Sequence, residues 1–156
     1  MKEYLDSLDN AKNELKRVDH LIFVSLKYTR TVDVIRSVIE RMLNAFEFGV
    51  NALVGKKKAR KKKLEVPTQI KLKCRLVKEE YDDEKLAEYL GLYLRLRDIL
   101  KAKYTRREEY RKNVTMISEL APGETHEINI ERLNEYYTKV KNFLEYIEGL
   151  IKWPDL

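Results

Sequence analysis

The chain of 156 residues carries 32 Lys and Arg against 26 Asp and Glu, a formal net charge of +6, and 44% of its residues are hydrophobic. This length suits one domain, and the composition excludes a disordered or collagen-like chain. No uncharged stretch approaches the roughly 20 residues that a membrane-spanning helix needs, and residues 1–20 lack a secretory signal. A single cysteine, Cys74, is typical of a reducing compartment. We therefore predict one cytoplasmic domain over residues 1–156, without membrane contact.

The first half of the chain predicts two long helices. Apolar residues recur every three or four positions over residues 3–28, which is the spacing of one helix face. Thr31 is a suitable N-cap for a second helix, and Gly55 is the expected stop of that helix. Because the connection between the two helices is short, we expect them to pack antiparallel. Residues 55–67 are predicted to form an exposed, mobile loop.

Most of the positive charge lies at the start of this loop. Residues 56–63 hold seven basic residues and no acidic one, which leaves 25 basic against 26 acidic residues elsewhere. Such a tract can bind phosphates with a strong salt dependence, but lysine runs also occur as solvated linkers. The candidate nucleic-acid-binding residues here are Lys56, Lys57, Lys58, Arg60, Lys61, Lys62 and Lys63. Further cations extend the basic segment beyond the loop, namely Lys71, Lys73, Arg75 and Lys78.

Residues 70–77 fit two patterns. Apolar and basic residues alternate strictly, as in a half-buried strand, but the spacing from Ile70 to Tyr81 also fits one helix face started by Pro67. We favour the helix, because a lone strand in an otherwise helical chain would have no partner strand.

The next segment predicts a helix over residues 86–104, with Asp82 and Asp83 as caps before it. Its wide apolar face suggests a central place in a bundle. Residues 108–120 are expected to continue this helix or to restart it.

The chain then predicts a turn and a closing helix. Residues 121–125 (APGET) are a turn signal, and residues 130–151 have the most regular helical spacing in the chain. Asn129 is the expected cap, and Pro154 suits the stop. The fold class predicted is therefore all-α: a single antiparallel bundle of four to six helices, with the basic loop between the second and third helices.

Familiar catalytic and cofactor motifs are absent from the sequence. His20, His126 and Cys74 do not have the spacing of zinc ligands, and the five glycines are too scattered to build a phosphate-binding loop. We therefore expect neither a metal site nor a cofactor.

Arg97 interrupts the apolar line of the helix predicted over 86–104, four residues after Tyr93 and three after Leu94. An arginine in a buried or groove-lining position needs a carboxylate, carbonyl or phosphate partner, and its planar guanidinium suits phosphate. An ion pair within the bundle would also account for it, as would a side chain that reaches the surface.

The segment around Arg97 resembles the motif of HEPN domains. These small helical bundles carry an Arg followed by a polar residue, a His four to six residues further on, and often a Tyr close behind. Arg97, Asp98 and Tyr104 match this motif, whereas Ala102 stands where the histidine is expected and Lys103 takes the only other suitable place. The order of a long first helix, a second helix, a variable loop, a motif helix and a closing helix is similar as well.

The resemblance implies a function without catalysis. Active HEPN ribonucleases pair two Arg/His motifs across a dimer, and their acid/base step needs a group that titrates near neutrality. Ala102 cannot supply that group, so the resemblance implies a homodimer that binds RNA or a nucleotide. Tyr104 would then add a stacking ring, and Arg106 and Arg107 would add phosphate contacts, beside Arg97.

Two other functions stay open. The protein could be a protein-interaction or dimerisation module with a protein partner and no role in nucleic-acid binding. It could also be a metal-independent ribonuclease that uses Arg97 together with Lys103 or Tyr104, although Lys103 would need a strongly lowered pKa.

Overall fold

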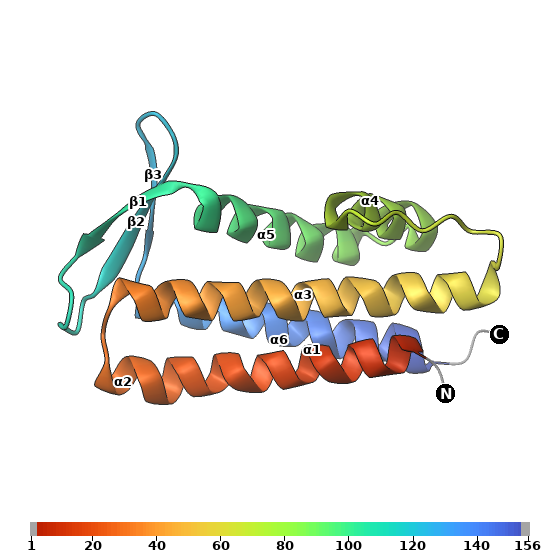
Figure 1. Ribbon diagram of the computed structural model, residues 1–156, viewed down its shortest axis with the longest axis horizontal. Coiled ribbons are helices and arrows are strands. Elements are labelled where there is room, and N and C mark those ends of the chain that lie inside the picture. Colours follow the sequence, from red (N-terminus) through yellow and green to blue (C-terminus); the bar gives the residue numbers. More distant parts are fainter. Residues whose placement is uncertain (1–2, 154–156) are drawn as a thin grey trace.

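A computed structural model of the chain describes residues 3–153. Its elements are, in order, α1 (Glu3–His20), η1 (Leu21–Ser25), α2 (Leu26–Tyr28), α3 (Val32–Arg60), α4 (Ile70–Tyr81), α5 (Glu84–Lys101), β1 (Lys103–Arg107), β2 (Thr115–Ala121), β3 (Glu124–Ile128) and α6 (Ile130–Lys152). The long helices lie side by side, with α1 and α5 running opposite to α3 and α6, and a small sheet stands at one end (Figure 1). None of the described helices has the length and apolar character to span a membrane.

The first predicted helix is confirmed over residues 3–28, where α1, η1 and α2 follow one another without a break. The five residues of η1 form a π-helical turn, a local widening that often marks a functional place in a helix. The N-cap expected at Thr31 is also confirmed, since its hydroxyl oxygen accepts a hydrogen bond from the backbone N–H of Val34 at 3.3 Å.

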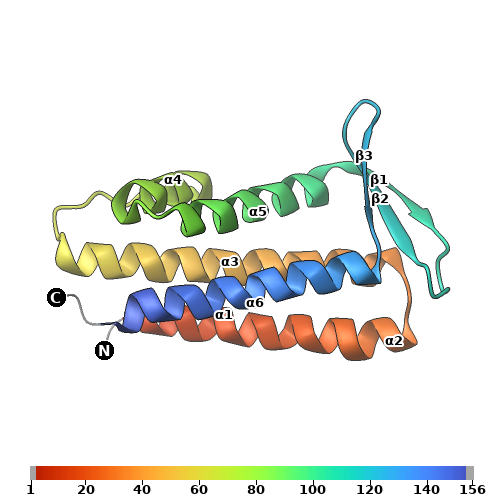
Figure 2. The same ribbon diagram turned by 180° about the vertical axis from the view of Figure 1, so that it is seen from behind.

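The central helix of the bundle is α3, which packs against α1, α4, α5 and α6. Figure 2 shows α6 lying along α1 and α3. Gly49 permits the close approach of α6, because a Cβ atom there would lie only 2.8 Å from the ring of Phe143 and 2.9 Å from Ile147. The apolar residues of α3 are almost all buried and form the middle of the core.

The stop predicted at Gly55 is wrong, because α3 continues to Arg60. Lys, Ala and Arg are good helix formers, and cations in the last turn interact favourably with the helix dipole. Gly55 instead allows α1 to come close, since a Cβ atom there would lie 2.7 Å from the Cβ of Tyr4. The exposed connection expected over 55–67 therefore begins only after residue 60.

The helical interpretation of residues 70–77 is confirmed by α4. Asp83 caps the next helix as expected, because its carboxylate accepts a hydrogen bond from the N–H of Leu86 at 3.1 Å. Asn129 caps α6 in the same way through the N–H of Arg132 at 2.8 Å. The stop expected at Pro154 lies outside the described residues.

The all-α prediction is wrong between residues 103 and 128, where three antiparallel strands pair in the order β1-β2-β3. The helix predicted to Tyr104 ends at Lys101, and the segment 108–120 forms a hairpin loop and β2 rather than a helix. The three strands pair with one another through two consecutive hairpins. The turn signal over residues 121–125 marks the second hairpin, with Gly123 at φ +80°.

One face of the sheet closes the end of the bundle. Met116 of β2 lies opposite Ile128 of β3, and both are fully buried. Ser118 is buried beside them and donates a hydrogen bond to the carbonyl of Ile99 at 2.9 Å, which joins β2 to α5. The structure is therefore a mainly helical bundle with a small sheet at one end.

Candidate functional site

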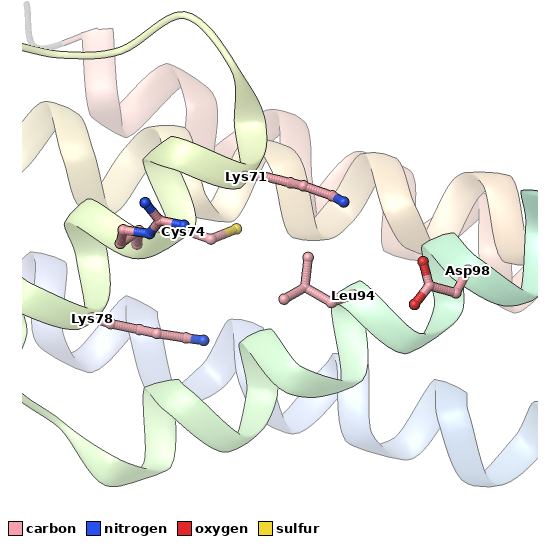
Figure 3. A pocket seen from close by; sticks show the side chains of 6 residues that line it. Lys71, Cys74, Lys78, Leu94 and Asp98 are labelled. Carbon is pink, nitrogen blue, oxygen red and sulfur yellow. The ribbon is translucent and has the colours of Figure 1, made fainter.

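A pocket of about 440 Å³ lies between α4 and α5. The side chains that line it are Lys71, Cys74, Arg75, Lys78, Leu94 and Asp98. Figure 3 shows Lys71 and Lys78 extending from α4 into the space in front of α5, with Leu94 and Asp98 on the opposite side. We call this set of six residues the α4/α5 pocket.

The spacing of α4 places its cations on one side. Cys74 and Val77 are buried against the bundle. Lys71, Arg75 and Lys78 are spaced by four and three residues, so they lie along one face of the helix, next to its buried face. All three are exposed. A basic stripe is thereby held by a rigid helix at the edge of the pocket.

The three cations of the pocket make no ion pair with any described residue. Asp98 is the carboxylate among the lining residues, and it lies beyond ion-pair distance of all three. By contrast, Lys61 pairs with Glu80 at 2.7 Å. Unpaired cations around one hollow create a positive potential that an anion can neutralise.

Arg97 stands beside this pocket on α5, one position before Asp98. Its side chain is half-buried, and its Nη1 atom is buried without a hydrogen-bond partner among the described residues. Its guanidinium lies 6.0 Å from the ring centre of Tyr93. No carboxylate of the described chain pairs with Arg97, so the ion pair considered as an alternative for this residue is absent from residues 3–153.

Cys74 gives the α4/α5 pocket an uncharged inner wall. Burial raises the pKa of its thiol to about 11, although the positive charges of Lys78 and Arg97 counteract part of this effect. The thiol therefore stays protonated at neutral pH and is a weak nucleophile. Together with Leu94 it presents apolar surface, while the charges stand at the rim.

The basic tract does not form one free polycation. Lys56 was expected in the exposed loop, but it is 6% exposed and buried in α3. Its ammonium donates hydrogen bonds to the carbonyls of Leu150, Ile151 and Trp153 at 2.6, 2.9 and 3.1 Å. Lys56 therefore holds the end of α6 and cannot face a polyanion.

Several other cations of the tract are held by the fold. Lys57 lies over the ring of Tyr81 at 4.7 Å, and the ammonium of Lys58 donates to the carbonyls of Lys62 and Leu64, both at 2.6 Å. Lys61 pairs with Glu80. Arg60 is exposed and also engaged in an interaction. The side chains of Lys62 and Lys63 are exposed and make no ion pair within the described chain.

The motif residues beyond Arg97 lie on the sheet. Lys103 and Tyr104 are consecutive in β1, so their side chains face opposite sides. Two guanidinium groups lie close to the ring of Tyr104, with Arg36 at 4.1 Å and Arg106 at 5.5 Å from the ring centre. Ala102, Lys103 and Tyr104 are among the residues that line a second pocket, of about 570 Å³. Lys103 and Tyr104 therefore border the same pocket, whereas Arg97 is not among the described residues that line it.

The arginines that follow Tyr104 have carboxylate partners. Arg106 pairs with Asp33 at 2.9 Å and with Glu109 at 3.2 Å. Arg107 pairs with Glu127 of β3 at 2.5 Å. A phosphate at this place would have to compete with these carboxylates, whereas no carboxylate of the described chain is paired with the cations of the α4/α5 pocket.

The sequence predicts the basic side of the α4/α5 pocket, which α4 supplies, but not the side that α5 supplies. The spacing of the cations at 71, 75 and 78 predicts a basic segment, but the position of α5 opposite them follows from tertiary packing. Among the described residues no group of three His, Cys, Asp or Glu is arranged to hold a metal ion.

Comparison of the chain with protein-family models, curated proteins and solved structures gives no match in any of the three. Function is therefore inferred from the geometry and chemistry of the chain.

Proposed function

We propose that this protein binds RNA through its phosphate groups, without cleaving it, and that the α4/α5 pocket is the centre of the binding surface. The observation that carries this proposal is the convergence of Lys71, Arg75 and Lys78 on one pocket, with no carboxylate paired to any of them. Cations that are free of internal partners can exchange water and counterions for phosphate, which favours binding at low salt.

Two features favour RNA over other polyanions. Arg97, Asp98 and Tyr104 match three positions of the motif that HEPN domains carry, and Arg97 lies beside the pocket. Lys62 and Lys63 lie in the connection between α3 and α4. They add two exposed positive charges that a flexible RNA strand could contact. Contacts of this kind recognise phosphate rather than base sequence.

The experiment that tests the proposal measures the affinity for single-stranded RNA as a function of salt. The variant Lys71→Gln, Arg75→Gln, Lys78→Gln removes the three pocket cations. A matched variant, Lys112→Gln, Lys139→Gln, Lys141→Gln, removes the same charge from exposed residues outside the pocket. Each phosphate contact contributes about 0.7 to the slope of log affinity against log salt for single strands, so the pocket variant should reduce the slope by about 2.

Equal slopes for the two triple variants would contradict the proposal, because binding would then follow net charge alone. Cleavage of the RNA in a chelator-containing buffer, abolished by Arg97→Ala, would instead support the metal-independent ribonuclease.

A second candidate function, the interaction or dimerisation module, has its own structural support. Phe23 and Val24 of η1 and Tyr28 of α2 are 53%, 40% and 80% exposed, although they are large apolar or aromatic residues in a helix. A second copy of the chain is the occupant to test. For this function, light scattering would show a dimer of the wild type and a monomer of Phe23→Glu. Neither the wild type nor the variant would bind RNA.

A further inference from the structure

We infer that the α4/α5 pocket holds a single terminal phosphate of the RNA, a phosphomonoester, rather than a phosphodiester from the middle of the chain. This inference rests on the proposed RNA binding and gives it a defined point of attachment. It follows from the charge of the pocket, its shape and the place of Asp98.

The charges that line the pocket favour a phosphomonoester. Three cations and one carboxylate line the pocket, which gives a net charge of +2. A phosphomonoester carries about −1.5 to −2 charges at neutral pH, because its second pKa is near 6. A phosphodiester carries a single negative charge and would leave the pocket with excess positive charge. The pocket thus matches the terminal group better than the backbone group.

Arg97 increases the positive potential at the same place. Its charge acts on the thiol of Cys74, a residue that lines the pocket, by lowering the pKa that burial raises. No carboxylate of the described chain pairs with Arg97 and neutralises its charge. A dianionic group therefore experiences the charge of Arg97 in addition to that of the three cations at the rim.

The shape of the pocket favours the end of an RNA strand. The pocket lies between α4 and α5, and α3 packs against both helices. Figure 3 shows α3 running behind the labelled side chains. Cys74, which is 2% exposed, forms part of the inner wall of the pocket. Its volume of about 440 Å³ is typical of sites for small molecules. The end of an RNA strand can enter the pocket from one side, whereas an internal nucleotide needs room for the RNA strand on both sides.

Asp98 limits the negative charge that can enter the pocket. Its carboxylate can accept a hydrogen bond from a terminal ribose hydroxyl. The same carboxylate repels a second or third phosphate, because like charges in a shared site disfavour one another. The pocket therefore suits a monophosphate end better than a triphosphate end.

The test compares RNA strands that differ only at their ends. A strand of roughly ten nucleotides, within the range of known single-strand sites, carries an internal fluorophore and a 5′-phosphate, a 3′-phosphate, a 5′-triphosphate or only hydroxyl ends. Anisotropy should show about tenfold tighter binding for one of the monophosphate ends than for hydroxyl ends, the equivalent of one charge-assisted contact. The pocket variant described above should bind that strand no better than the hydroxyl strand.

Two further measurements sharpen the result. The preference for the phosphate end should decline between about pH 7.5 and about pH 5, because the monoester becomes a monoanion below its second pKa. Asp98→Asn should bring the affinity for the triphosphate end to that for the monophosphate end. Glu88→Gln removes an exposed carboxylate of the same helix outside the pocket and should leave this ratio unchanged.

The outcomes separate the inference from the proposed function. Equal, salt-dependent binding of all four strands would overturn the terminal-phosphate inference and leave RNA binding in place. Displacement of the phosphate-ended strand by adenosine monophosphate, but not by adenosine, would support the pocket as a phosphomonoester site. Binding of adenosine monophosphate without binding of any strand would keep that site and overturn RNA as its ligand. If neither a strand nor the nucleotide binds, both are overturned.

Discussion

Lys56 and Ile151 are joined by a hydrogen bond of 2.9 Å, from the ammonium to the backbone carbonyl, between the ends of α3 and α6. The last carbonyls of a helix have no partner within the helix. The ammonium is largely shielded from water, because Lys56 is 6% exposed. A cation at this place both satisfies the carbonyls and complements the negative end of the α6 dipole.

Replacing Lys56 with Met should lower the free energy of unfolding by about 1–3 kcal/mol, because buried carbonyls lose their donor while the length of the side chain is kept. Chemical denaturation of the full chain measures this change. Lys63→Met, at an exposed position of the same tract, should stay within about 0.5 kcal/mol of the wild type. Equal stability of the two variants would show that the bonds of Lys56 to α6 do not stabilise the fold.

Two glycines should respond oppositely to alanine. At Gly49 an added Cβ would lie 2.8 Å from the ring of Phe143, so Gly49→Ala should destabilise by about 1–3 kcal/mol through overpacking. At Gly91, an exposed position of α5, an added Cβ would have no neighbour within 4 Å. Gly91→Ala should therefore stabilise the fold by about 0.4–1 kcal/mol. Thermal unfolding of the two variants checks both signs, and a stabilising Gly49→Ala would contradict the close packing of α3 on α6.

The helices could be predicted where periodicity and capping agree. Residues 3–28, the cap at Thr31 and the cap at Asn129 follow from local chemistry that tertiary contacts do not override. Gly55 misled the prediction because its role is set by Tyr4 of α1, a neighbour that local pattern does not contain. A glycine can mark either a stop or a close approach, and only packing separates the two.

The sheet and the pocket depended on contacts between distant residues. The β-branched residues near Thr115 and the turn at Gly123 were the local signals for a hairpin, but charged residues interrupt the apolar alternation in these short strands. The cations of α4 could be recognised from their spacing. Their use as one wall of a pocket, with Asp98 as the other, required the packing of α4 on α5.

Glu109 should stabilise the join between the first hairpin and α3. One carboxylate oxygen accepts a hydrogen bond from the N–H of Val32 at 2.9 Å, and the other from Arg106 at 3.2 Å. Glu109→Ala should therefore cost about 1 kcal/mol, the value typical of a lost N-terminal cap. Urea denaturation should rank Glu109→Gln, which keeps an acceptor, between the wild type and Glu109→Ala. Glu88→Ala is the control at an exposed position, and a loss as large for that variant would contradict the role of Glu109.

Cys74 should make the protein less stable in alkali. An unfolded thiol loses its proton near its ordinary pKa of 9.0, whereas burial raises the pKa of the folded thiol to about 11. Between these values the unfolded chain binds fewer protons than the folded one, so the free energy of unfolding falls as the pH rises from about 9 to about 11. Below pH 9 both states keep the proton, and the stabilisation is fully present.

The variant Cys74→Ala isolates this effect from the titration of the tyrosines and lysines, which is common to both proteins. It should be less stable than the wild type at pH 8, because a buried side chain is shortened. Its deficit should then shrink as the pH rises, since only the wild type loses the contribution of the protonated thiol. Denaturation curves in urea at several pH values between 8 and 11 measure that difference, and a deficit that stays constant or grows would contradict the raised pKa of Cys74.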